Sequence, residues 1–258
     1  MILKVENITS GYGKNNILNN INFCFETGDI LCIMGENGSG KSTLFKSLLG
    51  FVNIKSGKIS INDENILNWS NKKLSKYFSY IPQIHTPSFD YKVIDIVLMG
   101  RAGYLNFIDL PSKKDNILAL ECLKKVGIEH LYNRIYTELS GGERKLVLIA
   151  RALCQDAKYM IMDEPTSDLD FVKSQIVYDV LKDLSNRGYG IIISTHSPEY
   201  PFYNYNKLLL LKNGNMISFG TVKDTLNKDN LTKTYSTNID VIDIIDSKGN
   251  NRKICISI

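Results

Sequence analysis

The stretch Gly35-Glu36-Asn37-Gly38-Ser39-Gly40-Lys41-Ser42, followed directly by Thr43, fits the phosphate-binding pattern G-x-x-x-x-G-K-[ST]. The apolar run at 30–34 before it predicts a buried strand. Apolar residues at positions 44, 45, 48 and 49 predict an amphipathic helix after it, with Gly50 placed to end that helix. A glycine-rich turn before an ordinary helix is the structural alternative. The flanking strand and helix favour the phosphate-binding loop, because that motif requires both of them.

Each part of this loop suits phosphate chemistry. Glycines let backbone N–H groups close around phosphate oxygens, and the start of the helix adds the positive end of its dipole. Lys41 would reach the β- and γ-phosphates, and the Ser42 hydroxyl would ligate Mg²⁺. The loop therefore predicts nucleotide binding, and the rest of the chain must indicate what the nucleotide is used for.

Length and composition indicate a globular protein. The 258 residues can bury one large domain or two small ones. A hydrophobic share of 43% and a charged share of 22% are ordinary for this class. The net charge of +4 comes without a block of like charges, so we expect no nucleic-acid partner. Five cysteines without metal-ligand spacing predict a reducing compartment and thiols that pack in the core.

No targeting or membrane segment is expected. The first residues lack the charged-then-apolar pattern of a secretion leader. No apolar run approaches the ~18 residues that a membrane helix needs. The chain is therefore predicted to have neither a signal peptide nor a transmembrane segment, which leaves open whether it docks on a membrane protein.

The N-terminal part is predicted to be rich in strands. Apolar and polar residues alternate at 2–6 and 17–25, which predicts two strands at the edge of a β-rich region. Residues 56–62 predict another strand, and 79–83 predict a strand that Pro82 stops.

The middle of the chain changes to helical periods. These periods run from about 92 to 153, with Ser112 as a predicted helix N-cap. The strand pattern resumes at 159–162 and 191–194, with a helix at 172–184 between the two strands. Strands that alternate with helices indicate a mainly parallel sheet, within which the helical block is an insertion.

The C-terminal part begins with a hairpin signal. Asn213-Gly214 lies between two apolar runs, which predicts an antiparallel hairpin. The tail from residue 221 is predicted to start with one helix and to end in a strand at 254–258.

Two carboxylates, Asp163 and Glu164, follow the apolar run at 159–162. Open α/β sheets bind their ligands at the carboxyl ends of the strands. Asp163 could hold Mg²⁺ directly or through water, and Glu164 could orient or deprotonate an attacking water. A charged turn before Pro165 is the structural alternative. The phosphate-binding loop on the same chain favours the catalytic interpretation.

A second candidate anion site lies at Leu139-Ser140-Gly141-Gly142-Glu143. Ser140 and Glu143 form the capping-box pattern of a helix start, which is a sufficient structural explanation. Two glycines in the first turn nevertheless cost helix propensity, roughly 1 kcal/mol each relative to alanine. They also leave backbone N–H groups uncovered at the helix start, as an anion site requires. A second phosphate site on one chain is reasonable if it serves the nucleotide of another subunit.

Gln83 and His196 each follow a predicted strand. Ligands bind beyond the carboxyl ends of such strands, so both side chains are candidates for the phosphate site. A surface glutamine and a structural histidine are the alternatives, and the residues alone leave the choice open. His85 and His130 lack this placement and form no metal cluster with His196.

The ordered set of motifs resembles the ATP-binding-cassette (ABC) ATPases over essentially the whole chain. In the family's order, the matching residues are Tyr12, the loop from Gly35 to Thr43, Gln83, the signature from Leu139 to Glu143, Asp163-Glu164-Pro165, the D-loop Ser167-Asp168-Leu169-Asp170, and His196. Each motif is short, but the set in this order is highly specific.

The resemblance implies an α/β fold of the P-loop NTPase type. It would combine a RecA-like, mainly parallel sheet with an N-terminal antiparallel β region and an inserted ABC α-helical subdomain. In this division of a single ABC ATPase domain, 1–88 and 154–220 form the catalytic core, 89–153 the inserted signature subdomain and 221–258 a C-terminal appendage.

The family also implies a head-to-tail homodimer with two ATP molecules between the subunits. Glu164 would be the catalytic base, His196 would hold the γ-phosphate, and Gln83 would sense Mg²⁺ and the attacking water. Lys41 completes the catalytic set. Ser167 and Asp170 of the D-loop would tie the two sites together.

The implied ligand contacts follow from the same motifs. Mg²⁺, the expected cofactor, would be held by Ser42, Gln83 and Asp163. The residues expected to contact ATP are Tyr12, which would stack on adenine, Gly35, Glu36, Asn37, Gly38, Ser39, Gly40, Lys41, Ser42 and Thr43, with Ser140, Gly141, Gly142 and Glu143 from the second copy.

The finer resemblance is to ATPase subunits of importers for ferric siderophores, haem and cobalamin. Residues 97–101, 111–115, 143–153 and 169–171 look like that group. The chain departs from it at Asp168, where histidine is frequent, at Gly103, where proline is frequent, and at 197–201. These departures bear on the substrate and leave the ATPase motifs intact.

The resemblance therefore implies an ATPase that powers the import of an iron chelate (ferric siderophore or haem) or cobalamin. It would act on the cytoplasmic face of the cell membrane through a separate permease, which residues 86–99 would contact. A periplasmic or lipid-anchored substrate-binding protein would take part indirectly.

Two alternatives belong to other classes. A soluble ABC ATPase of DNA repair or translation would carry long coiled-coil insertions or two cassettes, which this sequence lacks. A non-hydrolysing ATP-binding regulatory module would not need Glu164 and His196.

Overall fold

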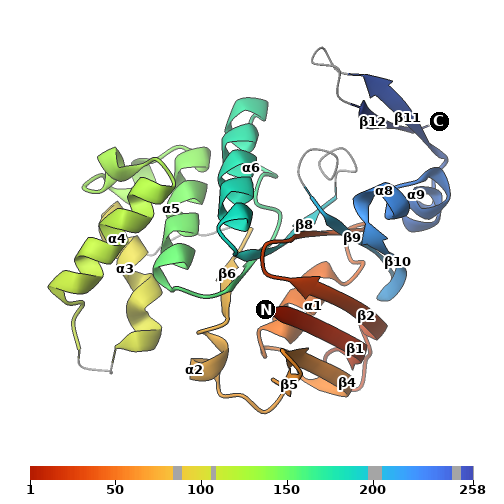
Figure 1. Ribbon diagram of the computed structural model, residues 1–258, viewed down its shortest axis with the longest axis horizontal. Coiled ribbons are helices and arrows are strands. Elements are labelled where there is room, and N and C mark those ends of the chain that lie inside the picture. The colour runs from red at the N-terminus through yellow and green to blue at the C-terminus, as the bar shows by residue number, and fades with distance from the viewer. Residues whose placement is uncertain (84–88, 106–108, 197–204, 246–250, 258) are drawn as a thin grey trace. The chain divides into compact units, whose positions relative to one another are not determined.

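The computed structural model describes residues 1–83, 89–105, 109–196, 205–245 and 251–257 (Figure 1). The chain divides into two compact units. The first, called the loop unit below, consists of Met1–Trp69 and Gly190–Ile258. The second, called the helical unit, consists of Ser70–Tyr189.

The loop unit is built on a mixed sheet with the strand order β5-β4-β1-β2-β10-β9-β3-β8. In it, β3 is parallel to β8 and β9, whereas β1 is antiparallel to β2 and β4. The strands are β1 (Ile2–Ser10), β2 (Leu18–Glu26), β3 (Ile30–Met34), β4 (Ile54–Ile61), β5 (Glu64–Asn65), β8 (Gly190–Thr195), β9 (Lys207–Lys212) and β10 (Asn215–Thr221).

The alternating N-terminal stretches form the strands β1 and β2, but not at an edge. β1 lies between β4 and β2, and β2 lies between β1 and β10, so the predicted edge position is wrong. Leu3, Val5 and Ile8 of β1 are buried. The buried positions change from odd to even between Val5 and Ile8. The pairing register of β1 shifts at the same place, where Asn7 has a φ of +52°. Alternation identifies a half-buried strand, but it does not identify the strand's neighbours.

The strands β3 and β8 of this sheet are buried on both faces. Every residue of β3 and of β8 is buried, as a continuous apolar run predicts for a parallel strand covered on both sides. After β3, the helix α1 (Lys41–Leu48) packs Leu44 and Phe45 into the core. Gly50 has a φ of +76° and ends the helix as predicted.

The hairpin of β9 and β10 is confirmed. The two strands are antiparallel, and both turn residues, Asn213 and Gly214, have positive φ values of +47° and +74°. A two-residue hairpin turn of this kind requires such values, which asparagine and glycine adopt readily.

The C-terminal part of the loop unit is more elaborate than predicted. Two helices, α8 (Val222–Thr225) and α9 (Lys228–Tyr235), pack on β9 and β10. A separate antiparallel pair then follows, β11 (Ile239–Ile245) and β12 (Asn251–Ser257). The sequence did not indicate β11, because Asp240 and Asp243 interrupt its apolar alternation.

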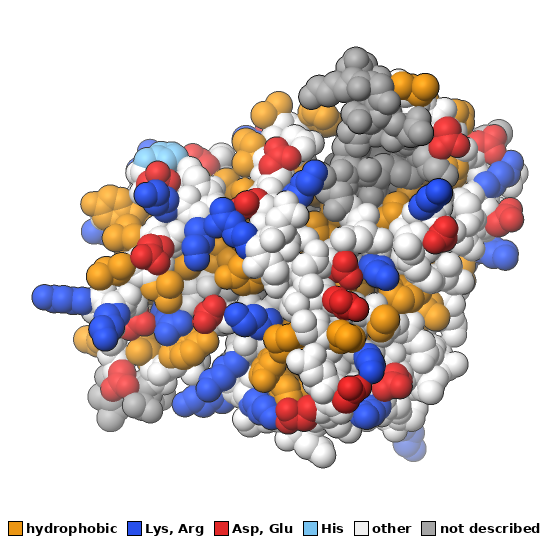
Figure 2. All heavy atoms as spheres, viewed as in Figure 1, with side chains coloured by type: hydrophobic (Ala, Val, Ile, Leu, Met, Phe, Trp, Pro, Cys, Tyr) orange, Lys and Arg blue, Asp and Glu red, His pale blue; other side chains and the backbone are white. Residues whose placement is uncertain are grey.

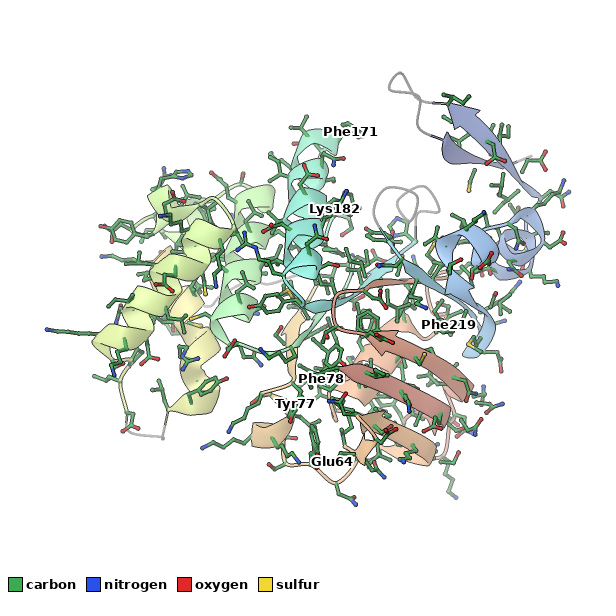
Figure 3. The ribbon with its side chains drawn as sticks, in the orientation of Figure 1. Glu64, Tyr77, Phe78, Phe171, Lys182 and Phe219 are labelled. Carbon is green, nitrogen blue, oxygen red and sulfur yellow. The ribbon has the colours of Figure 1, made fainter. Side chains whose placement is uncertain are left out.

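The helical unit combines two parallel strands with the predicted helical block. Phe78, labelled in Figure 3, stacks on Tyr159 across the strand pair, with ring centroids 5.5 Å apart. Helices α3, α4 and α5 pack on one another, and α6 packs on α5. The elements are α2 (Asn71–Leu74), β6 (Phe78–Ile81), α3 (Val93–Leu98), α4 (Lys113–Lys125), α5 (Gly141–Cys154), β7 (Tyr159–Met162) and α6 (Phe171–Asn186), with short 3₁₀ helices at Met99–Tyr104, Glu129–Leu131 and Tyr136–Glu138.

The predicted helix start at Ser112 is confirmed. The Ser112 hydroxyl accepts a hydrogen bond from the backbone N–H of Asp115, whose carboxylate accepts one from the backbone N–H of Ser112 at 2.9 Å. Arg101 also pairs with Asp115 at 3.0 Å. Bonds from the Ser112 hydroxyl and backbone, followed by the Arg101 guanidinium, lower the pKa of Asp115 to about 2.

Three of the five cysteines pack in the core, as expected. Cys32, Cys122 and Cys154 are buried, whereas Cys24 is exposed and Cys255 is half-buried, so the prediction was wrong for those two. Cys24 lies on the outward face of β2, between the buried Phe23 and Phe25. Within the described ranges, no group of His, Cys, Asp or Glu side chains could hold a metal ion by itself. The same ranges contain no helix of the length and apolarity that a bilayer crossing demands.

Acidic and basic side chains are intermixed on the face shown in Figure 2. This distribution agrees with the small net charge of +4.

Candidate functional site

The phosphate-binding loop has a backbone that only glycine allows. Gly38 and Gly40 have φ values of +80° and +108°, in the left-handed region that glycine adopts without strain. A Cβ atom on Gly35 would lie 2.2 Å from the carbonyl oxygen of Leu211, and one on Gly40 would lie 2.7 Å from a methyl carbon of Leu18. Glycine is therefore required by steric fit at Gly35 and Gly40, and favoured by the backbone angle at Gly38.

Polar groups of the loop are arranged for an anion. Lys41 is only 6% exposed, and its Nζ donates to the carbonyl oxygens of Gly35 at 2.7 Å and Glu36 at 3.1 Å. The Ser39 hydroxyl is buried without a hydrogen-bond partner among the residues that the structure describes. Gly40 is the N-cap of α1 and offers no side chain to the first amides of that helix. An ammonium group, an unmatched hydroxyl and a helix start without a side-chain cap fit a phosphate group.

His196 lies beside the start of this loop. Met34, the last residue of β3, pairs with Thr195, the last residue of β8. Gly35 and His196 each follow directly, so the structure brings these two predicted site residues together within the loop unit. Tyr12 follows β1 and is 51% exposed, as a side chain that stacks on a ligand could be.

In the helical unit, the carboxyl ends of β6 and β7 meet at the same edge. Ile81 pairs with Met162, and the backbone N–H of Asp163 donates to the carbonyl oxygen of Ile81 at 3.0 Å. The Asp163 side chain is largely buried there. Burial first, and then the negative charge of Asp163, raise the pKa of the neighbouring Tyr80 to about 12.

Gln83 and Glu164 are 81 positions apart in the chain, and the structure brings them into contact. The Gln83 amide Nε2 lies 3.3 Å from the Glu164 carboxylate and 3.4 Å from the hydroxyl of Ser167. Glu164 has a φ of +43°, an uncommon value for a residue with a side chain. The hydroxyl of Ser167 donates to the Glu164 carbonyl oxygen at 3.2 Å and holds this turn. Strained backbone that neighbouring residues hold in place is frequent at active sites.

The signature helix starts as predicted. The Ser140 hydroxyl caps the Glu143 N–H, and the Glu143 carboxylate accepts from the Ser140 N–H at 2.8 Å. These bonds from Ser140 lower the pKa of Glu143. Gly141 is exposed, while a Cβ on Gly142 would lie 3.0 Å from the Lys173 side chain. A side chain at position 142 would therefore require the Lys173 side chain to shift.

The two D-loop residues differ in their surroundings. Ser167 joins the Gln83–Glu164 group, whereas Asp170 caps α6. The Asp170 carboxylate accepts from the Lys173 N–H at 2.8 Å and pairs with the Lys173 ammonium at 3.1 Å. Asp170 thus has a structural role within this unit.

Sequence reasoning missed one residue of the helical unit, Lys145. It lies on α5 and is 8% exposed, and its Nζ donates to the carbonyl oxygens of Pro82 at 3.3 Å and Gln83 at 3.2 Å. Burial lowers the pKa of Lys145, while the charges of Asp168 and Asp163 oppose that shift. The sequence held one signal for the burial of Lys145. It lies four residues before Ile149, and therefore on a helix face that is otherwise apolar.

One cavity in the helical unit is lined by Gln83, Gly141, Lys145, Glu164 and Ser167 together with neighbouring residues. It has a volume of about 210 Å³ and combines acidic, basic and amide side chains. Its lining consists of Gln83, Tyr136, Gly141, Arg144, Lys145, Leu148, Glu164, Pro165, Ser167, Asp168 and Leu169.

Two predicted stretches lie at least partly outside the described residues. The expected permease contact at 86–99 is described only from residue 89 onward, and the departure from the importer pattern at 197–201 is not described.

A sequence model of a protein family described as ABC transporter matches residues 18–167, more than half of the chain. This span begins at β2 and ends at Ser167, so it includes the phosphate-binding loop, the signature and the Asp163-Glu164 pair.

Individual relatives match over nearly the full length. A molybdate import ATP-binding protein of Haemophilus influenzae is 37% identical over 235 residues, which are 90% of this chain and 87% of that protein. A Helicobacter pylori ATP-binding protein, whose name gives iron chelatin transport as its probable role, is 31% identical and covers 94% of this chain and 96% of its own. A solved structure, provisionally described as an inward-facing metal-chelate type ABC transporter, has a TM-score of 0.88 and 33% identity, with coverage of 99% and 97%.

Proposed function

This chain belongs to the ABC transporter family of ATP-binding proteins, and we propose that it is the ATP-hydrolysing subunit of an importer for an iron chelate or cobalamin. The contact between Gln83 and Glu164 at the carboxyl ends of β6 and β7 carries the hydrolytic part of this proposal. In this contact, the amide of Gln83 donates to the half-buried carboxylate of Glu164, next to the buried Asp163.

In the proposed reaction, Glu164 accepts a proton from the attacking water. The amide of Gln83 orients the Glu164 carboxylate. The hydrogen bond from the Ser167 hydroxyl to the Glu164 carbonyl oxygen fixes the turn and so keeps that carboxylate in place. Lys41 exchanges its carbonyl acceptors in the loop for oxygens of the β- and γ-phosphates. His196, beside the start of the loop, holds the γ-phosphate.

The residues present suit Mg²⁺. Ser42, Gln83 and Asp163 would hold it with hydroxyl, amide and carboxylate oxygens, the hard donors that this ion prefers. The unmatched Ser39 hydroxyl supports a triphosphate in the same loop. When bound, the ion neutralises charge on the β- and γ-phosphates.

A homodimer accounts for two phosphate-binding motifs on one chain. The phosphate-binding loop of one copy would bind ATP together with the signature residues Ser140 to Glu143 of the second copy. Ser167 and Asp170 of the D-loop would tie the two sites together. The exposed Gly141 at the start of α5 supports this arrangement, because it leaves the helix start open to an anion.

The substrate proposal rests on the relatives. One is named for molybdate, one for iron chelatin, and the solved structure for a metal chelate. A metal-containing solute is what these descriptions share, and ferric siderophores, haem and cobalamin are all metal chelates. An uptake assay that compares ferric chelates, haem, cobalamin and molybdate would separate these substrates.

A transporter role also sets the proposed location and partners. The subunit would sit on the cytoplasmic face of the membrane, bound to permease subunits and linked through them to a substrate-binding protein. The transport names of the relatives favour this reading over a soluble ATPase of DNA repair or translation. The Gln83–Glu164 contact favours turnover over a purely regulatory binding module.

The substitution Glu164→Gln tests the proposal. It keeps the shape of the side chain but removes the base, so we expect kcat for ATP hydrolysis to fall about 100-fold or more. ATP should still bind, and an ATP-dependent dimer should accumulate in size-exclusion chromatography.

Glu121→Gln, on the exposed side of α4, is the matched control and should keep wild-type turnover. Normal hydrolysis by Glu164→Gln would refute the assigned base. A variant that binds ATP but stays monomeric would refute the composite site.

A further inference from the structure

The C-terminal appendage contacts the backbone of His196. Tyr235, the last residue of α9, donates its hydroxyl hydrogen to the carbonyl oxygen of His196 at an Oη–O distance of 3.1 Å. The two residues are 39 positions apart in the chain, and both belong to the loop unit. The contact therefore joins the tail to the residue that follows β8.

Groups of β3 and of the phosphate-binding loop influence the Tyr235 phenol. Burial raises the pKa of Tyr235, and the Cys32 thiol, the Cys255 thiol and the Glu36 carboxylate add to the shift. Cys32 belongs to β3 and Glu36 to the loop itself. A tyrosine hydroxyl is already protonated at neutral pH, and the raised pKa keeps that of Tyr235 a hydrogen-bond donor to His196.

A second contact ties the same end of α9 to the sheet. The ammonium group of Lys212, the last residue of β9, donates to the Lys233 carbonyl oxygen and to the Ser236 hydroxyl, on either side of Tyr235. The turn after Lys212 reaches the phosphate-binding loop, because the Gly214 N–H donates to the Ser39 carbonyl oxygen at 2.9 Å. The end of α9 is therefore anchored independently of its contact with His196.

We propose that Tyr235 is a positioning residue for His196, which makes the C-terminal appendage part of the γ-phosphate site. The hydroxyl fixes the carbonyl group of His196 and so restricts where its imidazole can point. This inference rests on the role of His196 in the proposed function. A purely structural anchor is the alternative, and Lys212 provides the comparison.

Tyr235→Phe tests the role of the hydroxyl alone, because the ring remains. Loss of one hydrogen bond that acts on the γ-phosphate site should lower kcat for ATP hydrolysis about threefold to tenfold. The KM for ATP should change little, since the phosphate-binding loop supplies most of the ATP contacts. In a His196→Ala background, Tyr235→Phe should cause no further loss.

Lys212→Met is the matched control, because it loosens the same helix end without touching His196. It should leave kcat near the wild-type value, even if it lowers the melting temperature. An equal loss of kcat in both variants, or an undiminished effect of Tyr235→Phe in the His196→Ala background, would overturn the inference.

A second measurement is independent of activity. The chain has three histidines, His85, His130 and His196, so their imidazole NMR signals can be assigned by substitution. Tyr235→Phe should shift the His196 signal and leave the other two unchanged, and Lys212→Met should shift none of them. An unmoved His196 signal would refute the positioning role. Absent ATP hydrolysis in the wild type would instead refute the proposed function.

Discussion

The phosphate-binding loop and the Gln83–Glu164 group are built in opposite ways. In the loop, Lys41 bonds to carbonyl oxygens five and six residues earlier, so the contacts close within one short stretch. In the helical unit, Gln83 meets Glu164 across 81 positions, and Lys145 reaches Gln83 across 62. The proposed phosphate site is therefore local in the sequence, whereas the proposed catalytic pair, Gln83 and Glu164, depends on distant segments meeting.

Substitutions in the two regions should therefore have different effects on ATP binding and on turnover. Under the proposed function, a change in the loop removes groups that would contact the nucleotide directly. A change around Gln83 disturbs the orientation of the Glu164 carboxylate and leaves the phosphate-binding loop intact. Binding and turnover can be measured separately, and each of the following substitutions affects one side of this comparison.

Lys41→Ala should have the largest effect. Loss of an ammonium group that bonds to phosphate costs about 2 kcal/mol or more, so ATP affinity should fall roughly 30-fold or further. Isothermal titration calorimetry with ATP would measure this change. Lys46→Ala, on the exposed side of the same helix, is the control and should bind ATP normally. Unchanged affinity in Lys41→Ala would overturn the assignment of the loop.

Lys145→Met should have an intermediate effect that is confined to turnover. Without the ammonium group, the carbonyl oxygens of Pro82 and Gln83 lose a donor, and the amide of Gln83 no longer holds Glu164 in place. A small misplacement of this kind should lower kcat roughly 10-fold. ATP affinity should remain near the wild-type value, as titration calorimetry can check.

Two further variants sharpen that result. Lys145→Arg keeps a charged donor and should restore part of the lost turnover. Lys182→Met removes an exposed lysine from α6, labelled in Figure 3, and should change neither quantity. If Lys145→Met weakened ATP binding as much as turnover, the contrast between the two regions would not hold.

The smallest effect concerns stability and lies at the start of α4. The hydrogen bonds from Ser112, followed by the Arg101 guanidinium, lower the pKa of Asp115 to about 2. A carboxyl group with a lowered pKa stabilises the fold above its unfolded value, about 3.9, and loses this contribution as pH falls toward about 2. Asp115→Asn should therefore be less stable than the wild type at neutral pH.

The difference between Asp115→Asn and the wild type should narrow as pH falls below about 4, as urea unfolding midpoints would show. Asp183→Asn is the control, because Asp183 forms an exposed pair with Arg187 that should contribute little at any pH. A stability gap at Asp115 that does not depend on pH would mean that the ionised carboxylate is not responsible.

Several elements could be predicted because their signals are local. The capping boxes at Ser112 and Ser140 and the Asn213-Gly214 hairpin are backbone arrangements that a few neighbouring residues specify. The strand β11 was missed because two aspartates interrupt its alternation, and Cys24 was misjudged because composition does not indicate which face of a strand is outward.

The boundaries of the predicted division remain predictions. The sequence placed the helical insertion at 89–153, whereas contacts group the wider span Ser70–Tyr189 into one compact unit. Periodicity detects where helices begin, but compactness also depends on which strands pack with them. In this unit, β6 and β7 pair with each other and α5 packs on β6.

By itself, the sequence determined the phosphate-binding loop, the strand and helix on either side of it, and the helix starts, because glycine backbone freedom and side-chain capping act over a few residues. Only the tertiary structure decided that Gln83 touches Glu164, that Lys145 holds the segment with Gln83, and that Tyr235 reaches His196. Those contacts join residues that are 39 to 81 positions apart. They form because burial of the apolar strands and helices brings their polar ends together, and no local pattern records that meeting.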